Sequence, residues 1–101
     1  MKEGADPVLQ TLTADALAQF VTALDPDTKE TLALIALRGQ PLSKRALYEA
    51  LNYTRFRGDK AMTKLETLGL VKWTELGPAK AYSLTLDGIR AADTLKNATA
   101  N

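Results

Sequence analysis

The spacing of hydrophobic residues in the first quarter of the chain predicts a helix. Four of these residues recur on one helical face: Leu17, Phe20, Val21 and Leu24. Thr13 is a candidate N-cap, and Leu9 and Leu12 continue the apolar pattern upstream. We therefore expect a first helix at about residues 8–24.

A second helix is expected after the Asp-Pro-Asp segment at residues 25–27. Proline disfavours helix in the residue before it and is tolerated in a first helical turn, so this segment separates two helices. Asp27 and Glu30 have the spacing of a capping box. The apolar residues that follow leave almost no polar face: Leu32, Leu34, Ile35 and Leu37. We expect this helix to be the buried centre of the domain, with Gly39 as its C-terminal stop.

Two further helices joined by a tight turn are expected next. Ser43 can cap the first, with Leu42 packing on Leu47 as a hydrophobic staple, and Thr54 can cap the second. Asn52 lies in the turn, where a left-handed conformation is tolerated better by asparagine than by most side chains. Core residues of the second of these helices recur at helical spacing: Gly58, Ala61, Met62, Leu65 and Leu68.

From Leu70 the hydrophobic period changes to two, which predicts a two-stranded hairpin. Gly-Pro at residues 77–78 supplies the turn, and we expect Trp73 and Tyr82 to pack on each other across the strands as part of the core. Thr85 can cap a last helix, at about residues 86–97, whose apolar residues recur about every three positions: Leu86, Ile89, Ala92 and Leu95.

This order of elements predicts an α+β fold that is mainly helical. It is a winged helix-turn-helix, with a two-stranded β-hairpin as the wing and flanking N- and C-terminal helices. The chain has no internal repeat, and its 101 residues suit a single domain. We place the core of that domain at residues 26–86.

Composition argues against most enzyme chemistry. The chain has no cysteine and no histidine, which removes disulfides, thiolate catalysis, Ser-His triads and zinc sites built from these residues. No glycine-rich phosphate loop is present either. We therefore predict a protein that is not an enzyme and needs no metal and no cofactor. No apolar run approaches the roughly 20 residues of a membrane span, and residues 1–7 are polar, so we expect a cytoplasmic protein without a membrane partner.

Charge is unevenly distributed along the chain, although the formal net charge is only +1. Residues 1–37 contain two lysines and six acids, a sum of −4, whereas residues 43–64 contain six basic residues and two acids, a sum of +4. This asymmetry favours a protein whose two regions face different partners, one of them polyanionic. The alternative is a chance cluster on a solvated helix.

Three segments carry a family resemblance: LSKRAL at residues 42–47, LETLGLV at residues 65–71 and YSLTLDG at residues 82–88. They resemble the winged-helix transcription regulators of the MarR type, over roughly residues 28–95 and without an insertion in the helix-turn-helix. The resemblance implies that the helix at residues 55–68 enters the major groove of DNA.

The helical wheel of residues 55–68 places basic and polar groups opposite the core residues. Arginine and lysine can donate to guanine in the major groove, and an aromatic ring or a threonine methyl can touch the thymine methyl. We expect four residues to contact bases: Phe56, Arg57, Lys60 and Thr63. Phe56 has an alternative place in the core, against Tyr53 or a neighbouring helix.

Phosphate contacts are expected from helix caps, from basic residues at the helix edges and from the hairpin. They are Ser43, Lys44, Arg45, Thr54, Arg55, Lys64, Lys72 and Lys80. The hairpin turn lacks the arginine often found at the wing tip of the family, which makes a role for the wing in the minor groove doubtful.

Apolar residues of the two terminal helices are the candidates for a two-fold interface: Leu17, Phe20, Val21, Leu24, Ile89, Ala92 and Leu95. Their alternative role is to cover the core of the monomer. Two half-sites about 34–36 Å apart need two copies of the domain, so we expect a homodimer.

These expectations combine into a sequence-specific regulator of transcription that binds double-stranded DNA, a repressor that acts by occupying its site. No pocket for a small-molecule effector is visible in the sequence. One alternative is a winged-helix subunit that binds other proteins in a larger assembly, which the low net charge favours. Another is a replication or partition factor on the same fold.

Overall fold

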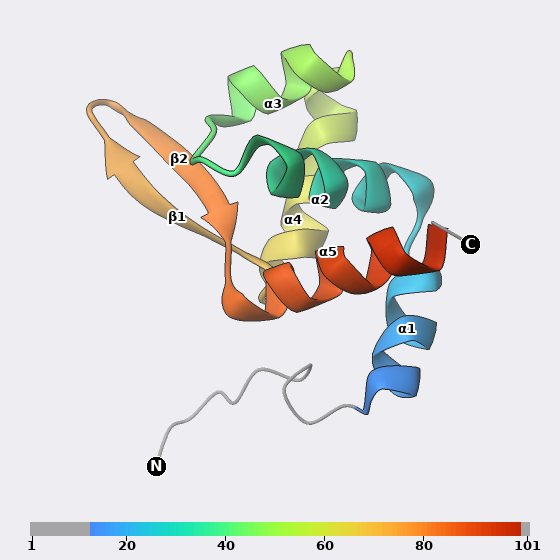
Figure 1. Ribbon diagram of the computed structural model, residues 1–101. Helices are drawn as coiled ribbons and strands as arrows, with labels where there is room; N and C mark the ends of the chain where they lie inside the picture. The colour runs from blue at the N-terminus through green and yellow to red at the C-terminus, as the bar shows by residue number, and fades with distance from the viewer. Residues whose placement is uncertain (1–12, 100–101) are drawn as a thin grey trace.

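The computed structural model describes residues 13–99, which form five helices and one antiparallel hairpin (Figure 1). In chain order these elements are α1 (Ala14–Thr22), α2 (Pro26–Arg38), α3 (Lys44–Leu51), α4 (Arg55–Thr67), β1 (Val71–Leu76), β2 (Ala79–Leu84) and α5 (Leu86–Thr99). The predicted winged helix-turn-helix is confirmed. The predicted extension of the first helix through Leu9 and Leu12 lies outside the described residues.

The helix starts are fixed by local hydrogen bonds. Four predicted caps are confirmed, since each side-chain hydroxyl accepts from the backbone N–H three residues later: Thr13, Ser43, Thr54 and Thr85. The predicted capping box at the start of α2 is wrong. Asp25 is the N-cap there, because its carboxylate accepts from both the backbone N–H and the hydroxyl of Thr28, at 3.2 and 2.7 Å, and Pro26 occupies the first turn.

The turn between α3 and α4 brings the two helices close together. Asn52 adopts the expected left-handed conformation, with φ 60° and ψ 42°, and ends α3. One turn into α4, Gly58 lies against the ring of Tyr48 on α3. The absence of a side chain at Gly58 therefore allows the close crossing that sets the angle of the helix-turn-helix.

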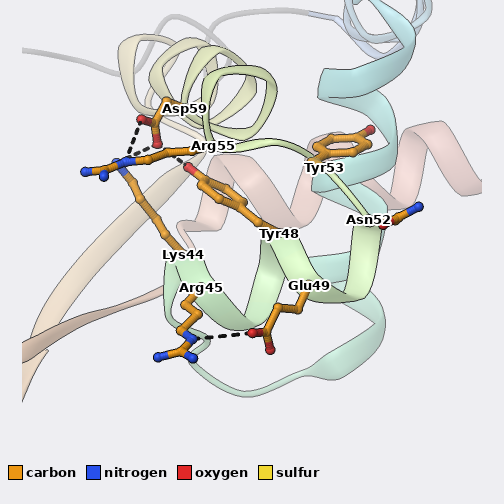
Figure 2. A pocket seen from close by; sticks show the side chains of 8 residues that line it. All are labelled: Lys44, Arg45, Tyr48, Glu49, Asn52, Tyr53, Arg55 and Asp59. Atoms are coloured by element: carbon orange, nitrogen blue, oxygen red, sulfur yellow. Dashed lines mark hydrogen bonds and ion pairs between the residues drawn. The ribbon is translucent and has the colours of Figure 1, made fainter.

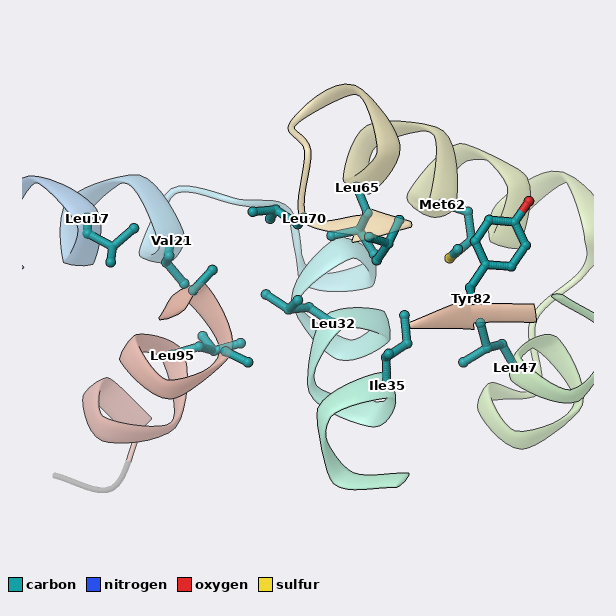
Figure 3. Close-up of a cluster of buried hydrophobic side chains, with 13 residues drawn as sticks. Leu17, Val21, Leu32, Ile35, Leu47, Met62, Leu65, Leu70, Tyr82 and Leu95 are labelled. Carbon is teal, nitrogen blue, oxygen red and sulfur yellow. The ribbon is translucent and has the colours of Figure 1, made fainter. Parts of the chain in front are cut away.

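Residues from every helix and from the hairpin contribute to one hydrophobic core (Figure 3). Its largest fully buried side chains include Leu32, Leu47, Met62, Leu65 and Leu70. As predicted, α2 lies at the centre, where it packs against α3, α4 and α5 (Figure 1).

Two expectations about burial are wrong, and helical or strand geometry explains them. Leu37 is 81% exposed, because the buried residues of α2 form one stripe that ends at Ile35 and Leu37 lies about half a turn away from it. In α5, two of the four apolar residues that recur about every three positions are buried, Ala92 and Leu95, whereas Leu86 and Ile89 are exposed.

The second correction concerns the aromatic pair of the hairpin. Trp73 and Tyr82 face each other in the register, as expected, but only Tyr82 is buried, whereas Trp73 is 44% exposed. Leu42 forms an isolated bridge with Tyr82 and covers that end of the hairpin. Trp73 lies on the other strand, β1, which Leu42 does not pair with. The ammonium of Lys80 is 4.1 Å from the centroid of its ring.

Candidate nucleic-acid interface

The outward face of α4 presents three of the four residues that were predicted to contact bases. Phe56, Lys60 and Thr63 are all exposed, and each lies opposite the buried residues of the helix. The alternative core position for Phe56 is wrong, since its side chain is 79% exposed. An exposed phenylalanine between basic residues at the start of a helix gives this face both apolar and cationic contact groups.

Arg57, the fourth predicted residue, lies on the flank of α4 that faces α2. Its guanidinium makes two parallel hydrogen bonds to Asp27, with Nε–Oδ2 at 2.8 Å and Nη2–Oδ1 at 2.9 Å. Its Cζ also lies 4.0 Å from the ring centroid of Tyr53. The hydrogen bond from Arg57 is the main cause that lowers the pKa of Asp27. The structure therefore holds Arg57 against α2 rather than on the outward face.

Lys64, two turns further along the same flank, pairs with the other acid at the start of α2. Its ammonium is 3.0 Å from Oδ1 of Asp25. The hydrogen bond from the Thr28 side chain, and then that from Lys64, lowers the pKa of Asp25 to about 2. Asp25 thus caps α2 and binds α4 at the same time.

The opposite flank of α4 meets α3 around Asp59 (Figure 2). Tyr48 donates its hydroxyl to the Asp59 carboxylate at 2.6 Å, and Lys44 and Arg55 each lie 3.9 Å from a carboxylate oxygen of the same residue. Burial raises the pKa of the Tyr48 hydroxyl, with the hydrogen bond to Asp59 as the second cause. These residues line an open groove between the two helices.

The charge segregation of the sequence does not persist in space. Of the six basic residues between positions 43 and 64, five have an acid within 4.0 Å among the described residues, and Lys60 has none. The acids of the N-terminal region neutralise α4 instead of facing a separate partner. Two of these ion pairs have hydrogen-bond distances of 3.0 Å or less, those of Arg57 and Lys64.

The other three ion pairs are loose. Those of Lys44 and Arg55 with Asp59 are 3.9 Å long, and the Arg45–Glu49 pair joins side chains that are 86% and 70% exposed. Exposed pairs of this kind contribute about 0–1 kcal/mol, so a phosphate group can replace the acid at little cost. Lys44, Arg45 and Arg55 therefore remain available for phosphate contacts, whereas Lys64, like Arg57, has an acid at the start of α2 within hydrogen-bond distance.

The remaining predicted phosphate contacts are the caps and the hairpin lysines. Ser43 and Thr54 use their hydroxyls as acceptors for helix N–H groups, and the hydroxyl hydrogen stays free to donate outward. Lys72 and Lys80 lie on opposite faces of the hairpin, because their strand partners are Ser83 and Glu75 and side chains alternate along a strand. The two lysines therefore cannot both contact the same groove of a DNA duplex.

Comparison with solved structures identifies the fold. A MepR mutant from S. aureus, solved with a bound oligodeoxyribonucleotide, has a TM-score of 0.74 and 19% sequence identity over 86% of this chain and 65% of its own. A ZitR mutant from Lactococcus lactis has a TM-score of 0.66 and 24% identity over 76% and 52% of the two chains. AdcR from Streptococcus pyogenes, an adhesin competence repressor, has a TM-score of 0.67 and 20% sequence identity over 83% of this chain and 63% of its own.

The fold is that of a MarR-type winged helix. This chain spans between about half and two thirds of the length of those three proteins. No protein-family model matches the sequence, and no curated protein does.

The residues that were predicted to form a homodimer interface divide into two groups. Leu17, Val21, Ala92 and Leu95 are buried within the core of a single chain, which is the alternative role that the sequence left open. Phe20 on α1 and Leu24, in the connection after α1, are partly exposed, and Ile89 is 47% exposed on α5. The surface still open to a second copy is therefore narrower than predicted.

The described part of the winged helix contains no group of three or more acidic, histidine or cysteine residues that could hold a metal ion. None of the helices in residues 13–99 is both long and apolar enough to cross a membrane.

Proposed function

We propose that this chain binds double-stranded DNA in a sequence-specific manner and regulates transcription. The observation that carries the proposal is the outward face of α4, where Phe56, Lys60 and Thr63 project from the helix that follows the tight turn. An α-helix with such a face fits the major groove, where lysine donates to guanine and Phe56 can touch the thymine methyl. A protein of similar fold has been solved with a bound oligodeoxyribonucleotide, which supports DNA as the partner.

Affinity and base selection come from different residues in this proposal. Lys44, Arg45 and Arg55 exchange their loose acidic partners for phosphates and release counterions. Lys60, which has no acidic partner among the described residues, adds the one cation at the centre of the base-reading face. Ser43 and Thr54 donate their hydroxyls to phosphates beside the helix starts.

We further propose that the active form is a homodimeric repressor, which excludes other proteins from a promoter by occupying it. Two copies are needed to read two half-sites on one face of a duplex. Three apolar residues at least partly open to solvent support pairing: Phe20 on α1, Leu24 just after it and Ile89 on α5. An Ile89→Glu variant should shift the chain from dimer to monomer in sedimentation equilibrium, and an unchanged mass would contradict this interface.

The test of DNA binding is a fluorescence anisotropy titration of random-sequence 20-base-pair duplexes, followed by selection of the bound fraction. We expect enrichment of particular duplexes, with affinity falling steeply as salt rises. Lys60→Gln should weaken the preference for the selected duplex, and Arg55→Gln, at a proposed phosphate contact, should lower the slope of log affinity against log salt by about 0.9. Lys96→Gln, the same charge change on α5, is the matched control and should leave both unchanged.

One alternative function has a specific observation in its favour. Internal pairing of five of the six basic residues lowers the positive potential of the helix-turn-helix, and Leu37 and Ile89 expose apolar surface on α2 and α5. Both features suit a winged helix that binds another protein. This alternative would be established by two results together: DNA binding that is absent or shows no sequence preference, and a stable heteromeric complex isolated from cells.

A further inference from the structure

The orientation of α4 about its own axis is fixed by contacts on both flanks. On one flank, Arg57 binds Asp27, and Lys64, two turns further along α4, binds Asp25. Both acids lie at the start of α2. On the other flank, Asp59 accepts the hydroxyl of Tyr48 on α3. A rotation of α4 in either direction must break one of these contacts.

The strongest of these contacts surrounds the Arg57 guanidinium. Two parallel hydrogen bonds to Asp27 define the plane of the group, and the ring of Tyr53 covers one face of it. Tyr53 is 8% exposed, and its hydroxyl donates to Glu30 and lies 3.4 Å from Asp27. Arg57 is therefore attached to a support that is anchored in α2 and in the core.

The inference rests on the function proposed above. We propose that Arg57 is a positioning residue, which together with Asp27 sets the rotation of α4 and thereby decides which bases Phe56 and Lys60 reach. This corrects the expectation that Arg57 itself contacts bases. A direct contact would require the guanidinium to leave both oxygens of Asp27 and the face of Tyr53 at once.

Geometry shows why this rotation matters for base selection. Side chains reach about 5–6 Å from a helix axis, so a 20° rotation displaces their tips by roughly 2 Å. Selective contacts tolerate a displacement of only about 0.5 Å. Phosphate contacts made by flexible lysine and arginine side chains follow such a movement, whereas base contacts do not. Loss of the Arg57–Asp27 pair should therefore reduce specificity and leave the electrostatic part of binding intact.

The test compares Arg57→Gln, Asp27→Asn and the double variant on two probes. The probes are the 20-base-pair duplex that the wild-type chain selects from a random pool and a scrambled duplex of equal composition. We expect each single variant to lower the ratio of the two affinities roughly tenfold, and the double variant to lower it no further, because both substitutions remove one shared contact. The salt slope should not change in any of them.

Arg57→Lys provides a second variant with the charge retained. Lysine cannot make two parallel bonds to one carboxylate, so the affinity ratio should fall as in Arg57→Gln while the salt slope stays at the wild-type value. Arg55→Gln, at a proposed phosphate contact, is the control that lowers the slope. Circular dichroism and thermal unfolding check that each variant keeps the wild-type helix content.

Three results would overturn the inference. If Arg57→Gln loses specificity while Asp27→Asn keeps it, Arg57 contacts the DNA directly, and a slope lowered by about 0.9 would assign that contact to phosphate. Additive losses in the double variant would also reject a shared role. If the wild-type chain selects no duplex, the proposed function fails and the inference fails with it, whereas the first two results leave the proposed function intact.

Discussion

The crossing of α3 and α4 leaves no space for a side chain at Gly58, so Gly58→Ala is a sharp test of the geometry of the helix-turn-helix. A Cβ at this position would lie 2.6 Å from Cζ of Tyr48, well inside the roughly 3.5–4.0 Å of ordinary carbon contacts. The neighbouring atoms are those of an aromatic ring, so relief requires Tyr48 to rotate away from α4.

The cost of that rotation follows from the contacts of Tyr48. Its hydroxyl donates to Asp59 at 2.6 Å, and a hydrogen bond to a charged group is worth about 1.5–3 kcal/mol, with the lower end appropriate to a carboxylate whose side chain is 45% exposed. Uncovering part of the ring adds about 1 kcal/mol. Alanine gains about 1 kcal/mol over glycine in helix propensity. The net effect of Gly58→Ala should be a destabilisation of about 1–2 kcal/mol.

Urea unfolding followed by circular dichroism measures this effect in two backgrounds. In the wild-type background Gly58→Ala should lower the free energy of unfolding. In the Tyr48→Ala background the obstruction is gone, so the same substitution should raise that free energy by about 0.5–1 kcal/mol. Thr63→Ala, on the exposed face of α4, controls for helix propensity alone. An equal destabilisation in both backgrounds, or a stabilisation in the wild type, would refute the reasoning.

Three further predictions concern caps, charge and a second crowded glycine. The pKa of Asp25 is lowered to about 2 from 3.8, so its contribution to stability is complete above about pH 4 and is lost as the pH falls toward 2; the difference in unfolding free energy between wild type and Asp25→Asn should shrink over that range in urea titrations. Thr54→Asp should keep the cap of α4 and the melting temperature while lowering DNA affinity several-fold in anisotropy titrations, since a carboxylate repels phosphate, whereas Thr54→Ala should cost about 1 kcal/mol of stability. Gly88→Ala should destabilise by about 2–3 kcal/mol in urea unfolding, because its Cβ would overlap the carbonyl oxygen of Leu70, a backbone atom that cannot rotate away. A wild-type unfolding curve for Gly88→Ala would contradict this packing.

The parts of the fold that were predictable depend on local chemistry. A capping hydroxyl accepts from an N–H group three residues away, and the left-handed conformation of Asn52 depends on that residue alone. Both features can therefore be predicted from a short stretch of sequence. Hydrophobic period likewise located all five helices and the hairpin among the described residues. The cap of α2 was misplaced because the capping-box spacing of Asp27 and Glu30 was followed instead of Pro26, whose preference for the first helical position makes the preceding Asp25 the N-cap.

The pairing of charges could not be predicted in the same way. Arg57 and Asp27 are 30 residues apart, and the Lys64–Asp25 pair spans 39 residues. Whether they meet depends on the angle at which α4 packs on α2, which follows from core packing rather than from any short pattern. Arg57 and Lys64 are seven residues apart and so lie on one flank of the helix, and a search for acids on the helix that covers that flank would have raised the alternative.

The division between tight and loose ion pairs limits how strongly the helix-turn-helix can respond to salt. Each phosphate contact contributes about 0.9 to the slope of log affinity against log salt, so six basic residues in contact with phosphate would give about 5.4 per copy. With Arg57 and Lys64 held by α2 and Lys60 on the base-reading face, only the loosely paired Lys44, Arg45 and Arg55 remain for phosphates, and the contribution falls to about 2.7. A domain with this arrangement gives up part of its electrostatic affinity and uses two of its cations to hold the base-reading helix in place. Its selectivity should therefore resist salt better than its affinity does.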